Sequence, residues 1–149
     1  MRVHVMHKHL MHLHIVGGPV TVRGMVETHE RQLVDQWRGL LTSYNEIASA
    51  LDRDLSERHA LGLSEFEALD RLIESGQDKL RMLDLASDMY LSQSALSRTV
   101  ARLERAGLVE RITCHDDRRA CFVVPTSDGR DRHAEARETH RQVLADHLS

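Results

Sequence analysis

The stretch "SQSALSRTVARLERAGLVER", residues 92–111, decides the fold, because four arginines are interspersed there with serines and leucines at helical spacing. Placed at about 100° per residue, the residues from Gln93 to Ala106 put Leu96, Val100 and Leu103 on one narrow face that can pack on a preceding helix. Short polar groups and an arginine in the exposed first turn suit a helix that enters the major groove of DNA. A helix face exposed only to solvent is the alternative interpretation. The half opposite the leucines carries Gln93, Ser94, Ser97, Arg98, Ala101, Arg102 and Arg105.

The segments on either side of this helix favour the DNA-binding interpretation. A short amphipathic helix is predicted around Met82–Met89, and the tight turn "YLS" leads to Ser92, a natural N-cap. Downstream, "LVERITC" (108–114) and "ACFVVP" (120–125) flank "HDDRR" (115–119), which predicts a hairpin with a charged tip. Guanidinium groups at such a tip can enter a narrow minor groove.

Further helices are predicted upstream. Apolar residues repeating every three or four positions predict a helix of about 25 residues, whose narrow seam can pack inside a bundle or against a second subunit. The segment "SERHALGLSEFEALDRLIES" (56–75) predicts two helices, the first ending at Gly62 and the second beginning with a capping box of Ser64 and Glu67. The seam of the long helix consists of Leu33, Trp37, Leu40, Tyr44, Ile47 and Leu51. The inward-facing residues expected in the second helix are Phe66, Leu69 and Ile73.

The two ends of the chain carry less information. Residues 1–26 are rich in histidine and β-branched residues and break at a Gly-Gly-Pro sequence, so either a short hairpin or a disordered arm fits them. At the other end, Thr126 is predicted to cap a polar helix that continues to Ser149.

Taken together, the motifs in residues 85–129 resemble the winged helix-turn-helix of the MarR family of bacterial regulators. The shared features are a leucine–alanine helix, a serine-rich recognition helix, the run "LERAGLVER" (103–111), a D-x-R motif at Asp117–Arg119 and a T-x-x-G motif at Thr126–Gly129. With "LGLSEFEALDRL" (61–72) upstream, the resemblance covers about residues 30–135.

The resemblance implies a mainly α fold with a small β-hairpin wing (α+β), that is, a winged helix-turn-helix with flanking dimerisation helices. It divides the chain into a His-rich arm (1–26), a long dimerisation helix (27–55), a DNA-binding lobe (56–125) and a C-terminal dimerisation helix (126–149). Many relatives continue through another helix that intertwines with the partner, so we expect the long helix, alone or with residues 1–26, to carry more of the dimer interface.

It also implies a function. Members of the family act as homodimers on palindromic operators, with half-sites about one helical turn apart, and many are repressors that a small-molecule effector releases from DNA. Arg119 would contact the minor groove, and Asp117 would brace it or a nearby arginine. The candidate DNA-binding residues are Ser92, Gln93, Ser94, Ser97, Arg98, Arg102, Arg105, Asp117, Arg118 and Arg119.

The charge distribution is compatible with this assignment. The 149-residue chain has a formal net charge of −3. Acidic residues outnumber arginines between Glu27 and Asp78, whereas arginines outnumber acidic residues between Ser92 and Arg119, so a locally basic face is compatible with an acidic chain. The sequence has two cysteines, no long uncharged apolar run and no recognisable secretion signal. We therefore expect a cytoplasmic, nucleoid-associated bacterial protein with no membrane partner.

The cysteines raise one alternative. Cys114 and Cys121 flank the predicted hairpin tip, where nearby basic side chains favour a reactive thiolate, so a redox-responsive regulator of the same fold is possible on chemical grounds. Two small strand residues are the simpler interpretation, because a cross-strand disulfide needs restrictive geometry. The sequence "CHDD" (114–117) also juxtaposes a thiol, an imidazole and carboxylates, but an exposed tip offers no water-excluding pocket, so we expect no enzyme activity.

The histidines of the N-terminal arm raise another. His4, His7, His9, His12 and His14 are clustered there, and neutral imidazoles are common ligands of zinc, copper and nickel. No acid or thiol joins them, and a metal site needs fixed geometry. A metal-responsive regulator is thus an alternative, while we expect neither a metal site nor a cofactor.

Two further hypotheses concern partners other than DNA. Trp37 and Tyr44 lie on the same stripe of the long helix and, together with His59, are candidates for the wall of an effector pocket. A core or interface position is the simpler interpretation of the two aromatic residues. A winged-helix interaction module that does not bind DNA is the competing class of function.

Overall fold

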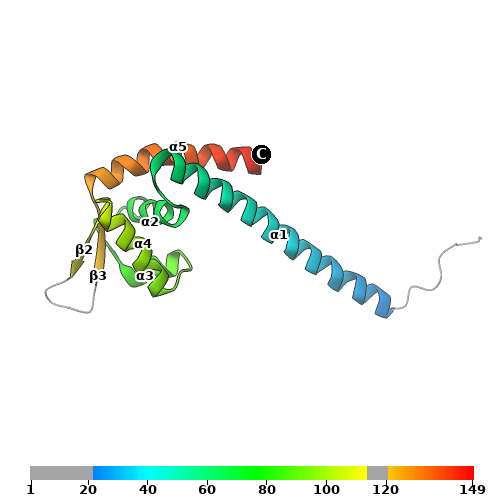
Figure 1. The fold of residues 1–149 in the computed structure, drawn as a ribbon. Helices are drawn as coiled ribbons and strands as arrows, with labels where there is room; N and C mark the ends of the chain where they lie inside the picture. The colour runs from blue at the N-terminus through cyan, green and yellow to red at the C-terminus, as the bar shows by residue number, and fades with distance from the viewer. Residues whose placement is uncertain (1–21, 114–120) are drawn as a thin grey trace, which may run out of the picture. The chain divides into compact units, whose positions relative to one another are not determined.

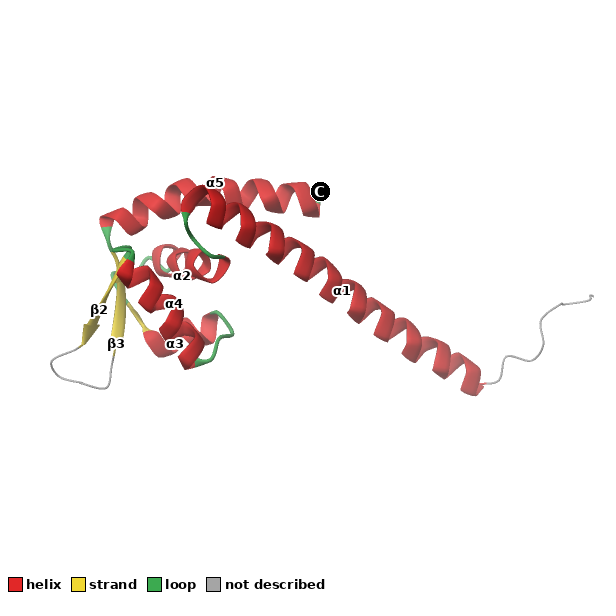
Figure 2. Ribbon diagram, viewed as in Figure 1, coloured by secondary structure: helices red, strands yellow, loops and turns green. Residues whose placement is uncertain are grey.

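The computed structural model describes residues 22–113 and 121–149, and the chain divides into two units, residues 1–40 and 41–149. The described part is mostly helical with one small sheet, as predicted (Figures 1 and 2). The elements in chain order are α1 (Val22–His59), α2 (Leu63–Glu74), β1 (Leu80–Arg81), α3 (Met82–Asp88), α4 (Gln93–Arg105), β2 (Val109–Thr113), β3 (Cys121–Pro125) and α5 (Ser127–Leu148).

The first helix, α1, is longer than predicted. It is a single helix of 38 residues, so the segment before Gly62 that we predicted as a separate helix is the end of α1. Leu51 and Leu55, at the end of the predicted helix, are both buried in the core. The helix therefore gains packing by continuing to His59.

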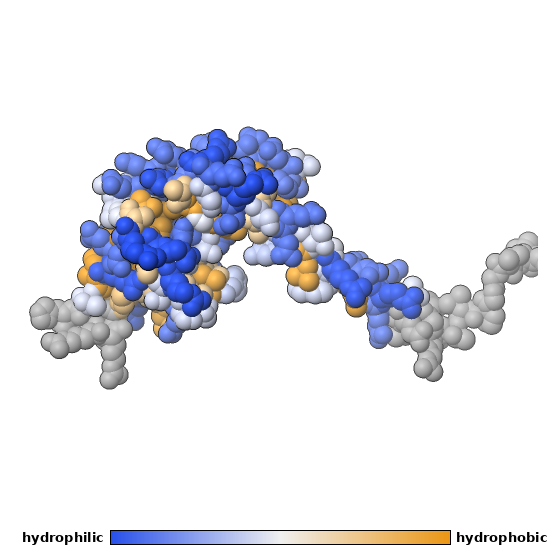
Figure 3. Space-filling model, viewed as in Figure 1, coloured by the Kyte–Doolittle hydropathy of each residue, from blue (hydrophilic) through white to orange (hydrophobic). Residues whose placement is uncertain are grey.

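The first part of the predicted apolar seam of α1 is exposed in the isolated chain. Its side chains lie at the surface among hydrophilic neighbours, and Figure 3 shows apolar atoms along the helix. The exposed members are Leu33, Trp37, Leu40 and Tyr44.

The core of the second unit lies between α2, α3, α4, α5 and the sheet. Helix α2 contacts α3, α4 and α5, and α3 contacts α4. Figure 1 shows α3 beside α4, and the hairpin of β2 and β3 next to α4. The largest fully buried side chains are Leu55, Leu61, Phe66, Leu69, Leu72, Leu85, Leu96, Val100, Leu103, Val109 and Val123.

The buried face of α2 is wider than the predicted stripe. Phe66 and Leu69 are buried as expected, but Ile73 is only half-buried and Leu72 is buried beside them. The reason is that α2 packs against α4 and α5 together, so more than one stripe of the helix is covered.

The start of α2 also differs from the predicted capping box. Gly62 is the N-cap, and its backbone N–H donates to Oε2 of Glu65 over 2.7 Å. The backbone N–H of Leu63 donates to Oδ1 of Asp52 in α1 over 2.8 Å. The predicted cap at Ser64 and Glu67 is therefore wrong, because Ser64 already lies inside the helix and the orphan amides use other carboxylates.

The three-stranded sheet is antiparallel with strand order β1-β3-β2. The predicted hairpin of β2 and β3 is confirmed, with Val109 opposite Pro125 and Thr113 opposite Cys121. Strand β1 was not predicted, since its two residues are too few to show an alternating pattern. The hairpin tip, residues 114–120, lies outside the described residues.

Two glycines allow the backbone geometry on either side of this hairpin. Gly107 ends α4 with φ +71°, a conformation that favours glycine. Thr126 caps α5 by accepting from the backbone N–H of Gly129 over 3.0 Å. A Cβ on Gly129 would lie only 2.0 Å from the carbonyl oxygen of Leu108, so the T-x-x-G motif supplies both a cap and a close backbone approach.

Candidate nucleic-acid interface

Helix α4 has the two faces that its sequence predicts. Its N-cap Ser92 accepts through Oγ from the backbone N–H of Ala95 over 3.2 Å, which satisfies an amide of the first turn. Leu96, Val100 and Leu103 are fully buried against the lobe. Of the predicted groove-facing residues, the exposed ones are Ser92, Gln93, Ser94, Arg98, Arg102 and Arg105, and Ser97 is half-buried.

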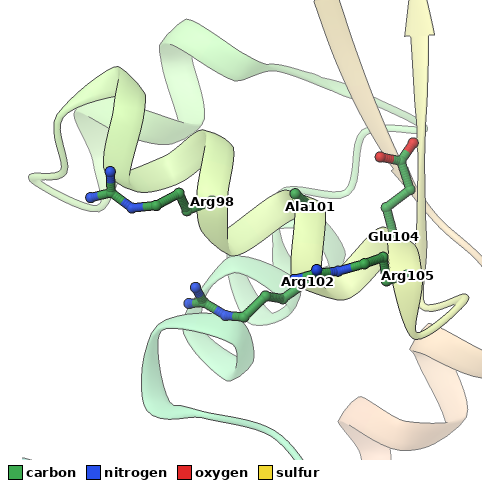
Figure 4. Close-up of a pocket in the computed structure, with 5 residues that line it drawn as sticks. All are labelled: Arg98, Ala101, Arg102, Glu104 and Arg105. Atoms are coloured by element: carbon green, nitrogen blue, oxygen red, sulfur yellow. The ribbon is translucent and has the colours of Figure 1, made fainter.

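The exposed half of α4 forms an open groove of about 340 Å³ lined by Arg98, Ala101, Arg102, Glu104 and Arg105. Figure 4 shows the three arginine side chains extending to one side of the helix, while Glu104 turns toward the strands. The groove is lined mainly by cations with a small residue between them, which suits close approach to a phosphate-bearing surface.

Arg102 is held within the protein. Its Nε donates to Oε1 of Glu65 at the start of α2, and its Nη2 lies 3.4 Å from Oγ1 of Thr99. Because the other oxygen of Glu65 accepts from Gly62, one carboxylate caps α2 and also ties α4 to it. This ion pair was not predicted, since nothing in the sequence spacing relates Glu65 to Arg102.

Arg111 in β2 joins the strand to α4. Its Nη2 donates to the carbonyl oxygen of Ser97 over 3.0 Å, and its Nε lies 3.4 Å from Oε2 of Glu104. The side chain is half-buried between the strand and the helix. Arg111 thus fixes the base of the hairpin against the recognition helix, a role that the sequence analysis missed.

Arg98 and Arg105 have no ion pair or hydrogen-bonded partner among the described residues. Two cationic side chains on the exposed face therefore remain available for an external anion. The arginines of residues 92–111 consequently divide into a free pair, Arg98 and Arg105, and a braced pair, Arg102 and Arg111.

Two exposed basic residues ahead of α3 lie over an aromatic ring of the sheet, and the sequence analysis missed both. The Nζ of Lys79 lies 4.6 Å from the ring centroid of Phe122 in β3, and the Cζ of Arg81 lies 5.5 Å from the same centroid. Strand β1 places these cations there by pairing with β3. The only signal in the sequence was the basic pair itself, which is uninformative without the strand pairing.

The predicted wing contacts Asp117, Arg118 and Arg119 lie outside the described residues, and so does Cys114. Cys121 is a half-buried free cysteine opposite Thr113 in the hairpin. The predictions for these residues therefore remain predictions.

The predicted effector-pocket residues lie in different settings. Trp37 and Tyr44 are exposed on α1, whereas His59 is half-buried and its Nε2 lies 2.7 Å from Oγ1 of Thr139 in α5. Burial, followed by the nearby Arg58 charge, lowers the pKa of His59. Their assignment to a pocket likewise stays a prediction.

A polar cluster joins α2 to α5. Nε2 of the buried His133 lies 2.8 Å from Oδ1 of Asp70, and this hydrogen bond lowers the pKa of the Asp70 carboxyl. The Phe66 ring stacks on His133 and on His140, with centroid distances of 5.5 and 4.6 Å. Burial lowers the pKa of His140. The lobe and the final helix therefore share a partly polar contact.

The described part of the chain contains neither a cluster of metal-ligating side chains nor a membrane-spanning helix. Within residues 22–113 and 121–149, no three His, Cys, Asp or Glu side chains gather as a metal site would require. No helix in the same ranges has both the length and the apolar composition needed to cross a bilayer. The His-rich arm lies almost entirely outside these ranges.

Helices α2, α3 and α4 with a hairpin packed beside α4 define a winged helix-turn-helix protein. The sequence profile of the MarR family matches residues 61–121, and no curated protein matches the chain. The chain belongs to the MarR family of transcriptional regulators.

Three solved structures illustrate the likeness. AbsC, a MarR family transcriptional regulator from Streptomyces coelicolor, is 34% identical over 75% of this chain and 75% of its own, with a TM-score of 0.69. Sco3205, a MarR family transcriptional regulator from the same organism solved in complex with DNA, is 33% identical over 81% of this chain and 77% of its own, with a TM-score of 0.71. The transcriptional regulator BldR from Sulfolobus solfataricus is 27% identical over 78% of this chain and 82% of its own, with a TM-score of 0.71.

Proposed function

We propose that this protein is a homodimeric repressor that binds palindromic operator DNA through α4 and the hairpin wing and is released by a small-molecule effector. The observation that carries the proposal is the exposed face of α4, where Arg98 and Arg105 have no protein partner among the described residues. The similarity to Sco3205, whose structure was solved in complex with DNA, supports DNA as the partner of that face.

Different residues of α4 have different proposed roles. Gln93, Ser94, Ser97 and Arg98 lie in the first two turns, which in a helix-turn-helix contact base edges in the major groove. Arg105 lies in the last turn and is placed for phosphate. The guanidinium of Arg102 is already engaged in the ion pair with Glu65. We therefore expect Arg102 to contribute less to DNA affinity than Arg105.

The wing is proposed to complete the interface. Arg119 enters the flanking minor groove, and Asp117 braces it or Arg118. The hairpin strands that carry this tip are anchored to α4 by Arg111, which supports a fixed position for the base of the wing.

The exposed seam on α1 supports the homodimer. A stripe that includes Leu33, Trp37 and Leu40 is larger than scattered surface apolar residues, and such a stripe marks an interaction surface. A second copy of α1 supplies the same stripe, as a two-fold interface requires. Two recognition helices held in this way read a palindrome.

The family assignment supports a proposal for the effector and the cellular setting. We propose that the effector binds between the dimerisation helices and the DNA-binding lobe, with Trp37, Tyr44 and His59 as candidate contacts. The protein acts on chromosomal DNA in the bacterial cytoplasm.

Fluorescence anisotropy tests this function directly. The protein is titrated into labelled duplexes from the DNA upstream of its gene and into a scrambled duplex of equal length, each at two salt concentrations. We expect tight binding to one upstream duplex, weaker binding to the scrambled duplex and a steep salt dependence, because phosphate contacts release counterions. Salt-insensitive or undetectable binding to every duplex would instead identify an interaction module that does not bind DNA.

Changing Arg98 separates base reading from general affinity. Truncation of a residue that contacts a base costs about 1–3 kcal/mol and relaxes sequence preference at one position. Arg98→Ala is therefore expected to reduce the difference in affinity between the operator and the scrambled duplex. Arg119→Ala is expected to weaken operator binding without unfolding the protein.

A further inference from the structure

The turn between α3 and α4 contains a tyrosine in a conformation that favours glycine. Helix α3 ends in a Schellman motif, with the N–H of Leu91 donating to Ala86 O over 3.0 Å and the N–H of Tyr90 donating to Ser87 O over 3.1 Å. Tyr90 occupies the residue after the cap and has φ +53°. A side chain with a Cβ is disfavoured there, because the left-handed conformation brings Cβ close to the backbone.

The end of α4 has the same motif with the expected residue. Leu108 N–H donates to Leu103 O over 2.9 Å, Gly107 N–H donates to Glu104 O over 3.0 Å, and Gly107 has φ +71°. The ends of α3 and α4 thus have the same backbone geometry, but the left-handed position holds a tyrosine in one and a glycine in the other. Local conformational preference does not account for the tyrosine.

Packing does not account for it either. Tyr90 is 96% exposed, whereas the other exposed large apolar side chains of the described residues range from 40% to 68%. Its side chain has no hydrogen bond or ring contact within the described part of the chain. The ring therefore contributes almost nothing to the folded chain and is disfavoured by its own backbone, which points to a partner outside the chain.

The position of Tyr90 indicates which partner. It lies two residues before Ser92, the N-cap of α4, and directly ahead of the exposed Gln93 and Ser94. In a helix-turn-helix the first helix crosses the DNA backbone while the start of the second enters the major groove. A residue between them faces the sugar-phosphate strand at the edge of the groove.

We propose that Tyr90 contacts the DNA backbone beside the entry of α4 into the major groove. Its hydroxyl donates a hydrogen bond to a phosphate oxygen, and its ring packs against the adjoining deoxyribose. This inference rests on the proposed DNA-binding function and adds to it a neutral contact that no basic motif would reveal.

The decisive variant is Tyr90→Gly, because its two expected effects have opposite signs. Glycine relieves the left-handed strain, so the melting temperature rises by about 3–5 °C. Loss of a hydrogen bond to a charged group weakens DNA binding by about tenfold. The dissociation constants are measured by anisotropy with both the upstream duplex and the scrambled duplex, and the melting temperature by circular dichroism.

Two further readouts identify the contact as neutral and as a backbone contact. The salt dependence of binding stays unchanged in Tyr90→Gly, since tyrosine releases no counterion. Affinity falls by the same factor on the upstream and scrambled duplexes, since phosphates carry no sequence information. Tyr90→Phe retains the ring and the strain but removes the hydroxyl, and is expected to lose only part of the affinity.

Ala60→Gly is the matched control. Ala60 is an exposed residue that follows α1 in the same left-handed conformation, with φ 52°, and its small side chain leaves little to contact a partner. The control is expected to raise the melting temperature and to leave DNA binding unchanged. It thereby separates the effect of the backbone from the effect of the tyrosine ring.

The outcomes distinguish this proposal from the proposed function. If the wild-type protein binds DNA with a steep salt dependence and Tyr90→Gly binds equally well, the contact is refuted while the function stands. If Tyr90→Gly changes only self-association in sedimentation, the ring serves a second copy and the DNA contact is likewise wrong. If the wild-type protein binds no duplex, the proposed function and this contact both fail.

Discussion

The two ends of α1 carry the same apolar side chains but place them in opposite environments. Leu33 and Leu40 are 51% and 67% exposed, whereas Leu51 and Leu55 are 6% and 0% exposed. All four lie on one helical stripe, so the repeat that predicts the helix does not distinguish its halves. The difference is that the rest of the lobe covers the second half, whereas nothing within the described chain covers the first.

The same contrast occurs among the arginines around α4. Arg102 and Arg111 find carboxylates and a carbonyl within the protein, whereas Arg98 and Arg105 find no such group in its described part. Side chains that are buried or ion-paired within the protein contribute to its stability. Exposed apolar side chains and unpaired arginines are where we expect a second subunit or DNA to bind.

The largest effect is expected in the buried half of α1. Leu55→Ala removes a fully buried side chain and is expected to lower the free energy of unfolding by about 3–5 kcal/mol. Urea denaturation measures the loss. The matched variant Leu33→Ala, assayed at a concentration where the chain is monomeric, is expected to change stability by less than about 0.5 kcal/mol. Equal losses would abolish the contrast between the two halves.

The exposed half is expected to affect association instead. Leu40→Glu places a charge in the proposed dimer seam and is expected to raise the dimer dissociation constant by about a hundredfold, about 2.7 kcal/mol. Analytical ultracentrifugation should show the mass falling from about twice 17.0 kDa to 17.0 kDa. Asn45→Glu, an exposed position on another side of α1, is the control and should remain dimeric. A dimer that tolerates Leu40→Glu would place the interface elsewhere.

The free and braced arginines are expected to differ in the kind of effect. Arg105→Met removes a proposed phosphate contact, so the salt dependence of DNA binding should decrease by about one unit per subunit with little change in stability. Arg111→Met breaks an internal brace, so the unfolding free energy should fall by about 1 kcal/mol while the salt dependence is retained. Salt titrations and urea curves on both variants measure these effects, and exchanged results would reverse the assignment.

The smallest effect is expected from pH. Burial holds the pKa values of His59 and His140 below the ordinary value of 6.5. The folded state therefore favours the neutral imidazoles, and their contribution is fully present above pH 6.5 and is lost as the pH falls through the lowered values. The urea midpoint should decrease between pH 7.5 and 5.5, and His140→Gln should flatten that dependence. A midpoint that decreases just as steeply in His140→Gln would assign the effect to other groups.

Parts of the candidate site were predictable because their signals are local. The amphipathic pattern of α4, the Ser92 cap and the two strands of the hairpin each depend on residues close together in the chain. Three features were not predictable in this way. The bond between Glu65 and Arg102 and that between Arg111 and Ser97 join residues that only packing brings together, and Lys79 meets Phe122 only through strand β1.

The exposure of Tyr90 belongs to the same group. Its left-handed backbone conformation follows from the way α3 ends, which the sequence does not signal because glycine is absent from that turn. The long α1 is a related case: the predicted separation of the long helix from a short helix that ends at Gly62 does not exist, since buried Leu51 and Leu55 stabilise a continuous helix.

The sequence by itself determined the helix-turn-helix followed by a hairpin, the buried face of α4 and the family, because caps, periodicity and turn residues act over a few positions. Tertiary structure alone decided which apolar side chains are buried and which charged side chains form ion pairs within the protein. Hydrophobic periodicity and charge are properties of a segment, whereas burial and ion pairing need a second segment at the right distance. That is why Arg102 and Arg105, alike in the sequence, have different roles in the fold.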